Sequence, residues 1–143
     1  MKPFESYLGT EDVRKTTPDF ALARALRKDS YERATFVLTL PITEASSKIL
    51  YENLYEALRQ LADAIIILNG YKSYSHAASI AFLAHKSGFS ETLLERFDHA
   101  REKRNKAKYY GKPIYPTDAE DIIKLYKELA PILTQTIDNE ESD

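Results

Sequence analysis

The amino-acid sequence predicts an all-α protein, an antiparallel up-and-down bundle of four to five helices. Apolar residues recur at spacings of three and four from about residue 18 onward, which is the period of an amphipathic helix. Glycine occurs only four times in the 143 residues, and no stretch alternates between apolar and polar residues as a strand would. Residues suited to helix N-caps precede most of the apolar stretches.

The first helix is expected to take Thr17 as its N-cap, because threonine accepts hydrogen bonds from exposed backbone N–H groups and Pro18 suits the first helical position. Pro41 is expected to end this helix. A second, longer helix is predicted from about residue 43 to residue 69. Its apolar stripe repeats at alternating spacings of three and four, as in a coiled-coil seam: Tyr51, Leu54, Leu58, Leu61, Ile65 and Leu68.

The acidic residues Glu52, Glu56 and Asp63 of this second helix lie about 160° to 200° from Leu54 around the helix axis, at ~100° per residue. We therefore expect them on the outer face, which argues against a carboxylate metal site inside the bundle. We predict no bound metal and no cofactor.

Serine residues mark the beginnings of the next two helices. Ser75 is predicted to cap a short third helix that ends at Gly88, and Ser90 is predicted to cap a fourth helix that runs to about Tyr110. Gly111 then suits the left-handed conformation in which helices commonly end.

A capping box of Thr117 and Glu120 is predicted to open the fifth helix, and Pro131 is expected to kink it. The acidic residues at the end of the chain are expected to fray. At this length the chain is expected to form one domain. It is divided into an N-terminal arm at residues 1–16, the helical bundle at residues 17–137 and an acidic tail at residues 138–143.

Composition and charge exclude several classes of protein. The formal net charge of −2 and the pI near 6.0 exclude a uniformly basic nucleic-acid coat, although they allow a local basic patch. Without cysteine there is neither a disulfide nor a thiolate metal site. The most apolar run, Leu61–Leu68, is far shorter than the ~20 residues that span a bilayer. We therefore expect a cytoplasmic protein that does not contact a membrane.

Arg104 is the most informative residue, because it falls on the apolar stripe of the predicted fourth helix. At ~100° per residue it lies about 20° from Leu93, whereas Lys103 and Lys106 point away and are expected to face solvent. A charged group in a dry core costs several kcal/mol unless it is paired. Arg104 is therefore expected to pair with a carboxylate of the second or fifth helix, to open onto water, or to bind a phosphate group in a cleft.

The stretch around Arg104, REKRNKAKYYGK, holds six basic residues and one acidic residue. Cations that contact phosphates, together with aromatic rings that stack on bases, are typical of sites for nucleotides or single-stranded RNA. We therefore predict a nucleotide- or RNA-binding site in this stretch. Its expected residues are Arg101, Arg104, Asn105, Lys108, Tyr109 and Tyr110.

Three stretches of the sequence are similar to parts of a known family. NLYEALRQLADAIIILNGY is similar to a long helix that contains tyrosine, YSHAASIAFL to the next helix, which begins near a histidine, and RNKAKYYG to an Arg-Asn motif on a later helix. Through these stretches the chain resembles the HEPN family, over roughly residues 45–133. The resemblance implies a helical bundle that binds a nucleotide or RNA, or that partners a nucleotidyltransferase. It also implies a homodimer whose arginine motifs face each other.

Many HEPN proteins cleave RNA, and in these ribonucleases four to six residues separate the arginine from a histidine that follows it. Arg104 matches the arginine, but Tyr109, Tyr110 or Gly111 stands where the histidine would be. A tyrosine, with a pKa near 10, is a poor base at neutral pH, whereas a histidine near 6.5 exchanges protons there. The resemblance therefore implies ligand binding more directly than catalysis.

The candidate catalytic residues are Arg104, Tyr109 and His76. His76 is expected at the start of the third helix, where the positive end of the helix dipole lowers its pKa and favours the neutral ring. His85 and His99 lack metal-ligand spacing and are expected at the surface. Three functions remain open: binding of a nucleotide or RNA, an interaction module in which Arg104 is a structural ion pair, and a metal-independent ribonuclease that uses Arg104 with His76 or Tyr109.

Overall fold

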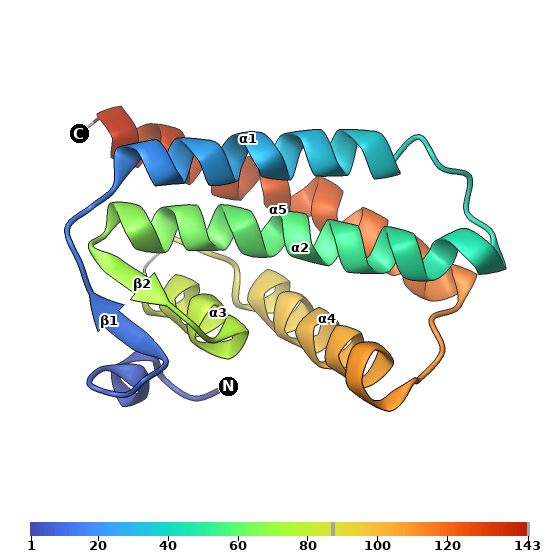
Figure 1. Cartoon of the computed structure of the whole chain (residues 1–143), viewed down its shortest axis with the longest axis horizontal. Helices are drawn as coiled ribbons and strands as arrows, with labels where there is room; N and C mark the ends of the chain where they lie inside the picture. The colour runs from blue at the N-terminus through green and yellow to red at the C-terminus, as the bar shows by residue number, and fades with distance from the viewer. Residues whose placement is uncertain (87, 143) are drawn as a thin grey trace.

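The computed structural model describes residues 1–86 and 88–142, and this part of the chain forms a bundle of five helices, as predicted, together with a small two-stranded sheet. Helices α1 and α5 both pack along α2, while α3 and α4 lie on the side of α2 opposite α1 (Figure 1). No helix of the described ranges combines the length and the apolar composition needed to cross a membrane. The helices are α1 (Phe20–Val37), α2 (Glu44–Leu68), α3 (His76–His85), α4 (Glu91–Tyr110) and α5 (Pro116–Ser142).

Helix α2 is the centre of the bundle. It contacts the other four helices, and every side chain from Leu50 to Ile67 is buried or half-buried. A helix that is covered on several sides needs apolar residues around most of its circumference, which explains the run of isoleucines near its end. The predicted start of α2 near residue 43 is confirmed. Thr43 caps the helix: its hydroxyl accepts a hydrogen bond from the N–H of Ser46, whose hydroxyl accepts one from the N–H of Thr43.

The predicted caps of α3 and α4 are also confirmed. The side chain of Ser75 accepts a hydrogen bond from the N–H of Ala78, and that of Ser90 accepts one from the N–H of Leu93. Gly111 ends α4 with a φ of 65°, in the left-handed region. In the bundle, the C-terminal end of α4 lies on the same side as the N-terminal end of α2 (Figure 1).

A small antiparallel sheet was not predicted. Strand β1 (Val13–Lys15) pairs with β2 (Tyr71–Ser73), and a short 3-10 helix, Phe4–Tyr7, precedes β1. Phe4 and Val13 are buried in the core, so the N-terminal segment packs on the bundle. Strands of three residues are too short to show the alternation by which a strand is recognised in a sequence.

The turn from α2 to β2 requires glycine. Gly70 has a φ of 84°, and a Cβ there would lie 3.2 Å from the carbonyl oxygen of Thr16. The carbonyl of Gly70 also accepts a hydrogen bond from the N–H of Thr16 at 2.9 Å. The end of α2 thereby fixes the path of the segment that leads into α1.

The start of α1 differs from the prediction. The helix begins at Phe20, because the side chain of Asp19, rather than that of Thr17, accepts a hydrogen bond from the N–H of Leu22 at 2.9 Å. Pro18 therefore precedes the helix instead of occupying its first position.

The start of α5 differs as well. The helix begins at Pro116, and the predicted capping box of Thr117 and Glu120 is not formed. Instead, the carboxylate of Asp118 accepts a hydrogen bond from the N–H of Tyr115 at 2.8 Å. The carboxylate thus satisfies an N–H group at the positive end of the helix dipole.

The end of α5 extends beyond the predicted bundle. The helix continues to Ser142, so the acidic residues that were expected to fray are helical up to that point. Asp138 pairs with Arg27 of α1, and Glu140 pairs with Lys86, after α3, at 2.7 Å. These contacts connect the end of α5 to the rest of the bundle.

Candidate functional site

Arg104 lies where the sequence places it, on the apolar stripe of α4. Only 6% of its surface is exposed, and the residues one turn away on either side, Ala100 and Ala107, are buried. Alanine side chains are short, so they leave room for the guanidinium between α4 and α2.

A carboxylate of α2 holds this guanidinium. Glu52 accepts hydrogen bonds from Nε of Arg104 at 3.1 Å and from Nη2 at 3.0 Å, which makes the ion pair bidentate. The side-chain oxygen of Asn105 accepts a third hydrogen bond, from Nη1, at 3.2 Å. Burial alone would lower the pKa of Arg104, but Glu52 raises it, so the arginine is charged. Of the alternatives left open by the sequence, pairing with a carboxylate of the second helix is the one observed.

The Arg104–Glu52 pair is enclosed on one side only. The side chain of Glu52 is 41% exposed, whereas that of Arg104 is almost fully covered. A carboxylate with this exposure keeps much of its hydration, so its release into water costs less than the release of a buried one. The side of the pair that faces solvent is therefore that of the Glu52 carboxylate.

Tyr55 connects Arg104 to the start of α3. The guanidinium carbon lies 5.7 Å from the centroid of the Tyr55 ring, a distance typical of a cation–π contact. The Tyr55 hydroxyl and Nδ1 of His76 are hydrogen-bonded at 3.1 Å. The ring is fully buried and also packs against Phe97 of α4, with the ring centroids 5.9 Å apart. Helices α2, α3 and α4 thus meet at Tyr55.

His76 is the half-buried first residue of α3. Burial lowers its pKa to about 4, and the charges of Arg59 and Arg104 act in the same direction, while Glu56 opposes them. The direction agrees with the prediction, but burial rather than the helix dipole is the main cause. The His76 ring is therefore neutral at pH 7.

The acidic residues of α2 do not form the outer stripe that was predicted. Glu52 faces α4, while Glu56 and Asp63 both pair with Arg59 of their own helix. Asp63 also accepts a hydrogen bond from the hydroxyl of Ser79 in α3 at 2.8 Å. The prediction is wrong because α2 is covered on several sides, so its polar face lies against α3 and α4 instead of solvent.

The C-terminal end of α4 and the loop after it carry exposed lysines and tyrosines: Lys106, Lys108, Tyr109, Tyr110 and Lys112. We refer to these five residues as the basic end of α4. Tyr109 and Tyr110 are 65% and 77% exposed, so both rings are open to a stacking partner. The ammonium of Lys108 lies 5.7 Å from the centroid of the Tyr109 ring.

Two other basic residues of α4 are already paired. Arg101, a predicted ligand contact, is half-buried and donates from Nε to Asp98 at 2.9 Å. Lys103, which was expected to face solvent, instead pairs with Asp118 of α5 at 2.8 Å, because α5 packs beside α4 there. Arg101 is thus a weaker candidate for ligand contact than the sequence suggests.

The remaining histidines are exposed, as predicted. His85 lies 2.8 Å from a carboxylate oxygen of Glu5, and His99 is on the outer face of α4. In the ranges that the structure describes, no three His, Asp or Glu side chains are grouped so that they would hold a metal ion.

The contact between Tyr55 and His76 was missed at the level of the sequence. No spacing rule connects two residues on different helices, since their proximity depends on how the helices pack. The available signal was chemical, because the hydroxyl of a buried tyrosine requires a hydrogen-bond partner. The neutral nitrogen of a half-buried histidine is such a partner.

No family model and no curated protein matches the sequence. The chemistry of the site therefore rests on its own groups: a buried guanidinium, a neutral imidazole and several tyrosine hydroxyls. A guanidinium binds phosphate through two parallel hydrogen bonds and needs no metal ion to do so. The His76 imidazole, with its pKa lowered to about 4, is a weak proton acceptor at neutral pH.

Proposed function

We propose that this protein binds a nucleotide or RNA, with Arg104 holding a phosphate group. The observation that carries the proposal is the Arg104–Glu52 pair, in which an almost fully buried guanidinium has a partly exposed carboxylate as its partner. Asn105 and Tyr109 would orient the ligand, and Lys108 would attract it. The resemblance to the HEPN family supports the same class of ligand.

In this proposal a phosphate takes the place of Glu52. Two phosphate oxygens have nearly the geometry of a carboxylate, so they accept the same two N–H groups of Arg104. Glu52 holds the guanidinium in its binding orientation while no ligand is present. The exchange moves one exposed carboxylate into water and does not require α4 to shift.

The basic end of α4 would then bind the rest of the ligand. Its lysines attract the phosphate backbone, and the exposed rings of Tyr109 and Tyr110 offer surfaces on which bases stack. Each base stacked on an aromatic side chain contributes about 1–3 kcal/mol, largely independently of sequence. Binding through lysine and arginine weakens as the salt concentration rises.

Arg104→Ala is expected to weaken the binding of a labelled single-stranded oligoribonucleotide by about 10- to 150-fold, because hydrogen bonds to charged groups contribute roughly 1.5–3 kcal/mol. Fluorescence anisotropy at low salt measures the affinity. Arg96→Ala is the matched control, since Arg96 is also on α4 and pairs with a carboxylate, that of Glu128 in α5. The control is expected to retain wild-type affinity within about threefold.

Glu52→Gln is expected to change the affinity for RNA in the opposite direction from Arg104→Ala. It removes the charge that competes with the phosphate, so affinity should rise while the melting temperature falls, because Arg104 then lacks a charged partner. Glu128→Gln is the control. If both Arg104→Ala and Glu52→Gln lower the melting temperature and leave the affinity unchanged, Arg104 is only a structural ion pair and the proposal is wrong.

A second candidate function is metal-independent cleavage of RNA, favoured by the contacts that His76 and Arg104 both make with Tyr55. In the tautomer whose Nδ1–H donates to the Tyr55 hydroxyl, Nε2 of His76 would accept the proton of a 2′-hydroxyl, and Arg104 would stabilise the charge on the phosphate. With its pKa lowered to about 4, His76 would be a weak base for this step. Our first proposal expects bound RNA to remain intact during incubation with the protein and a chelator. Cleavage that persists with the chelator and disappears in His76→Gln would instead establish the second candidate.

A further inference from the structure

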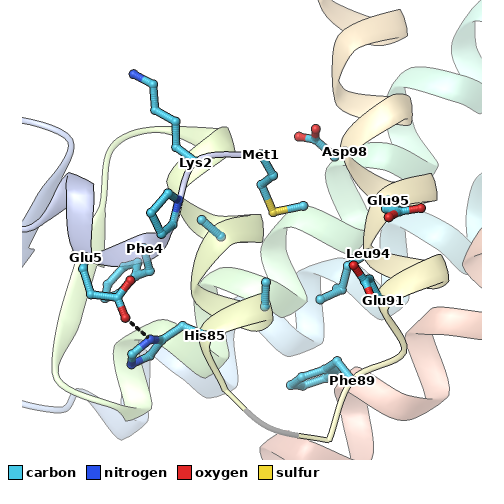
Figure 2. Close-up of a pocket in the computed structure, with 13 residues that line it drawn as sticks. Met1, Lys2, Phe4, Glu5, His85, Phe89, Glu91, Leu94, Glu95 and Asp98 are labelled. Atoms are coloured by element: carbon cyan, nitrogen blue, oxygen red, sulfur yellow. Dashed lines mark ion pairs between the residues drawn. The ribbon is translucent and has the colours of Figure 1, made fainter.

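A hollow of about 730 Å³ lies between the N-terminal segment, α3 and the N-terminal half of α4. We refer to it as the acidic groove. The accessible apolar side chains that line it are those of Met1 and Phe89, which form its floor, because Phe4 and Leu94 are almost fully buried. Figure 2 shows Leu94 of α4 and Phe89, which precedes α4, on the same side of the groove, opposite Phe4.

Carboxylates surround this apolar floor: Glu5, Glu91, Glu95 and Asp98. Two of them have partners within the chain, since Glu5 lies 2.8 Å from His85 and Asp98 pairs with Arg101 at 2.9 Å. The groove therefore contains two internally paired acids and two others.

The other two acids, Glu91 and Glu95, are exposed and one turn apart on α4. Neither forms an ion pair with any residue of the described ranges. Lys2 also lines the groove, but its side chain extends away from the hollow in Figure 2. An apolar floor beside two free carboxylates suits a segment that carries both an aromatic side chain and a positive charge.

The basic end of α4 has this chemistry. Tyr110 is the most exposed large apolar side chain of the described residues, and Tyr109 lies next to it. Lys106, Lys108 and Lys112 are exposed, and none of the three forms an ion pair within residues 1–86 and 88–142. One chain thus carries a groove and a surface with complementary charge.

We infer that the basic end of α4 of one molecule docks into the acidic groove of a second copy. The ring of Tyr109 or Tyr110 would lie on the floor formed by Met1 and Phe89, and lysine ammonium groups would pair with Glu91 and Glu95. A molecule cannot fill its own groove in this way, because the two surfaces lie at opposite ends of a helix about 30 Å long.

This contact joins two different surfaces, so it repeats from copy to copy and forms an open chain or a closed ring. It differs from the dimer with facing arginine motifs that the resemblance implies, in which both copies use the same surface. It also uses the residues that we propose for RNA, so RNA and a second copy would compete for the basic end of α4.

Sedimentation velocity of the full chain at low salt tests the inference. The wild type is expected to show a mass that increases with concentration above 16.4 kDa, and added salt is expected to reduce it. A groove variant, Glu91→Lys with Glu95→Lys, and an end variant, Lys108→Glu with Tyr110→Ala, should each associate at least tenfold more weakly. Glu11→Lys with Glu120→Lys changes the net charge as the groove variant does, at exposed acids elsewhere, and should associate like the wild type.

Mixing the two variants gives the sharpest outcome. The groove variant retains its basic end, and the end variant retains its groove. In the mixture the basic end of the first can therefore dock into the groove of the second, which should give a 1:1 pair that grows no further. The pair also shows that both variants are folded. If the mixture forms no such pair, the inference is overturned. This is the result expected of a dimer in which both copies use the same surface.

Two further results would also overturn it. One is a wild-type protein that stays monomeric up to ~1 mM, since such association would be weaker than about −4 kcal/mol. The other is an association that the groove variant leaves unchanged. RNA binding by the groove variant is expected to be at least as tight as that of the wild type, so a failure of this inference is distinguishable from a failure of the proposed RNA site.

Discussion

Tyr55→Ala is expected to lower the free energy of unfolding by about 3 to 5 kcal/mol. The Tyr55 ring is fully buried and packs against Phe97 and His76, so its removal leaves a cavity where α2, α3 and α4 meet. The affinity for RNA should fall as well, because Arg104 loses the ring that supports its guanidinium. Urea denaturation followed by circular dichroism measures the first effect, and anisotropy measures the second.

Two other tyrosine variants serve as controls for this prediction. Tyr55→Phe keeps the ring but leaves Nδ1 of His76 without its partner, which should cost about 1 kcal/mol. Tyr110→Ala removes a ring that is 77% exposed and should change the stability by less than about 0.5 kcal/mol. Equal losses for Tyr55→Ala and Tyr110→Ala would contradict the buried position of Tyr55.

The helices could be predicted because their signals are local. The caps Thr43, Ser75 and Ser90 bond to N–H groups three residues away, and this relation depends only on the nearby chain. The start of α1 shows where such signals become ambiguous. Thr17 and Asp19 are both suitable N-caps, and the sequence offers no local reason to prefer Asp19, which caps the helix.

Features that depend on distant partners were not predicted. The strand at Val13–Lys15 exists because the turn at Gly70 brings β2 beside it, 56 or more positions along the chain. The end of α5 was expected to fray, yet the ion pair of Asp138 with Arg27 connects residues 111 positions apart. The pattern of one segment contains no information about a partner at such a separation.

The candidate site likewise combines a feature that one helix predicts with a contact that depends on a distant partner. The burial of Arg104 followed from its angle on α4, which is a property of one helix. Its partner did not follow, because Glu52 lies away from the main stripe of α2, and only the packing of α4 against that side brings it into contact with Arg104. When a helix is covered on more than one face, a prediction of its buried residues that assumes a single inner stripe is wrong.

Acidification is expected to reveal the neutral state of His76. Its pKa is about 4 in the folded protein and about 6.5 in the unfolded chain, so the unfolded chain binds a proton between these values and the folded protein does not. Stability from this group is therefore present above pH 6.5 and is lost as the pH falls toward 4. Between pH 7 and pH 5 the loss amounts to about 2 kcal/mol.

The titration of Asp63 changes the stability of the folded protein in the opposite direction. Burial raises its pKa to about 6 against the effects of Arg59 and Ser79, so protonation of Asp63 in acid favours the folded protein. The wild type alone would therefore show only the difference between the two contributions. A variant that changes one of them is needed to separate them.

His76→Gln provides this separation, because glutamine retains a hydrogen-bonding group near Tyr55 but does not titrate. We expect the variant to lose less stability than the wild type between pH 7 and pH 5, by about 2 kcal/mol, as measured by urea denaturation at each pH. The Asp63 contribution is present in both proteins and cancels in the comparison. Parallel stability curves for the two proteins over this range would show that His76 is not held neutral by its burial.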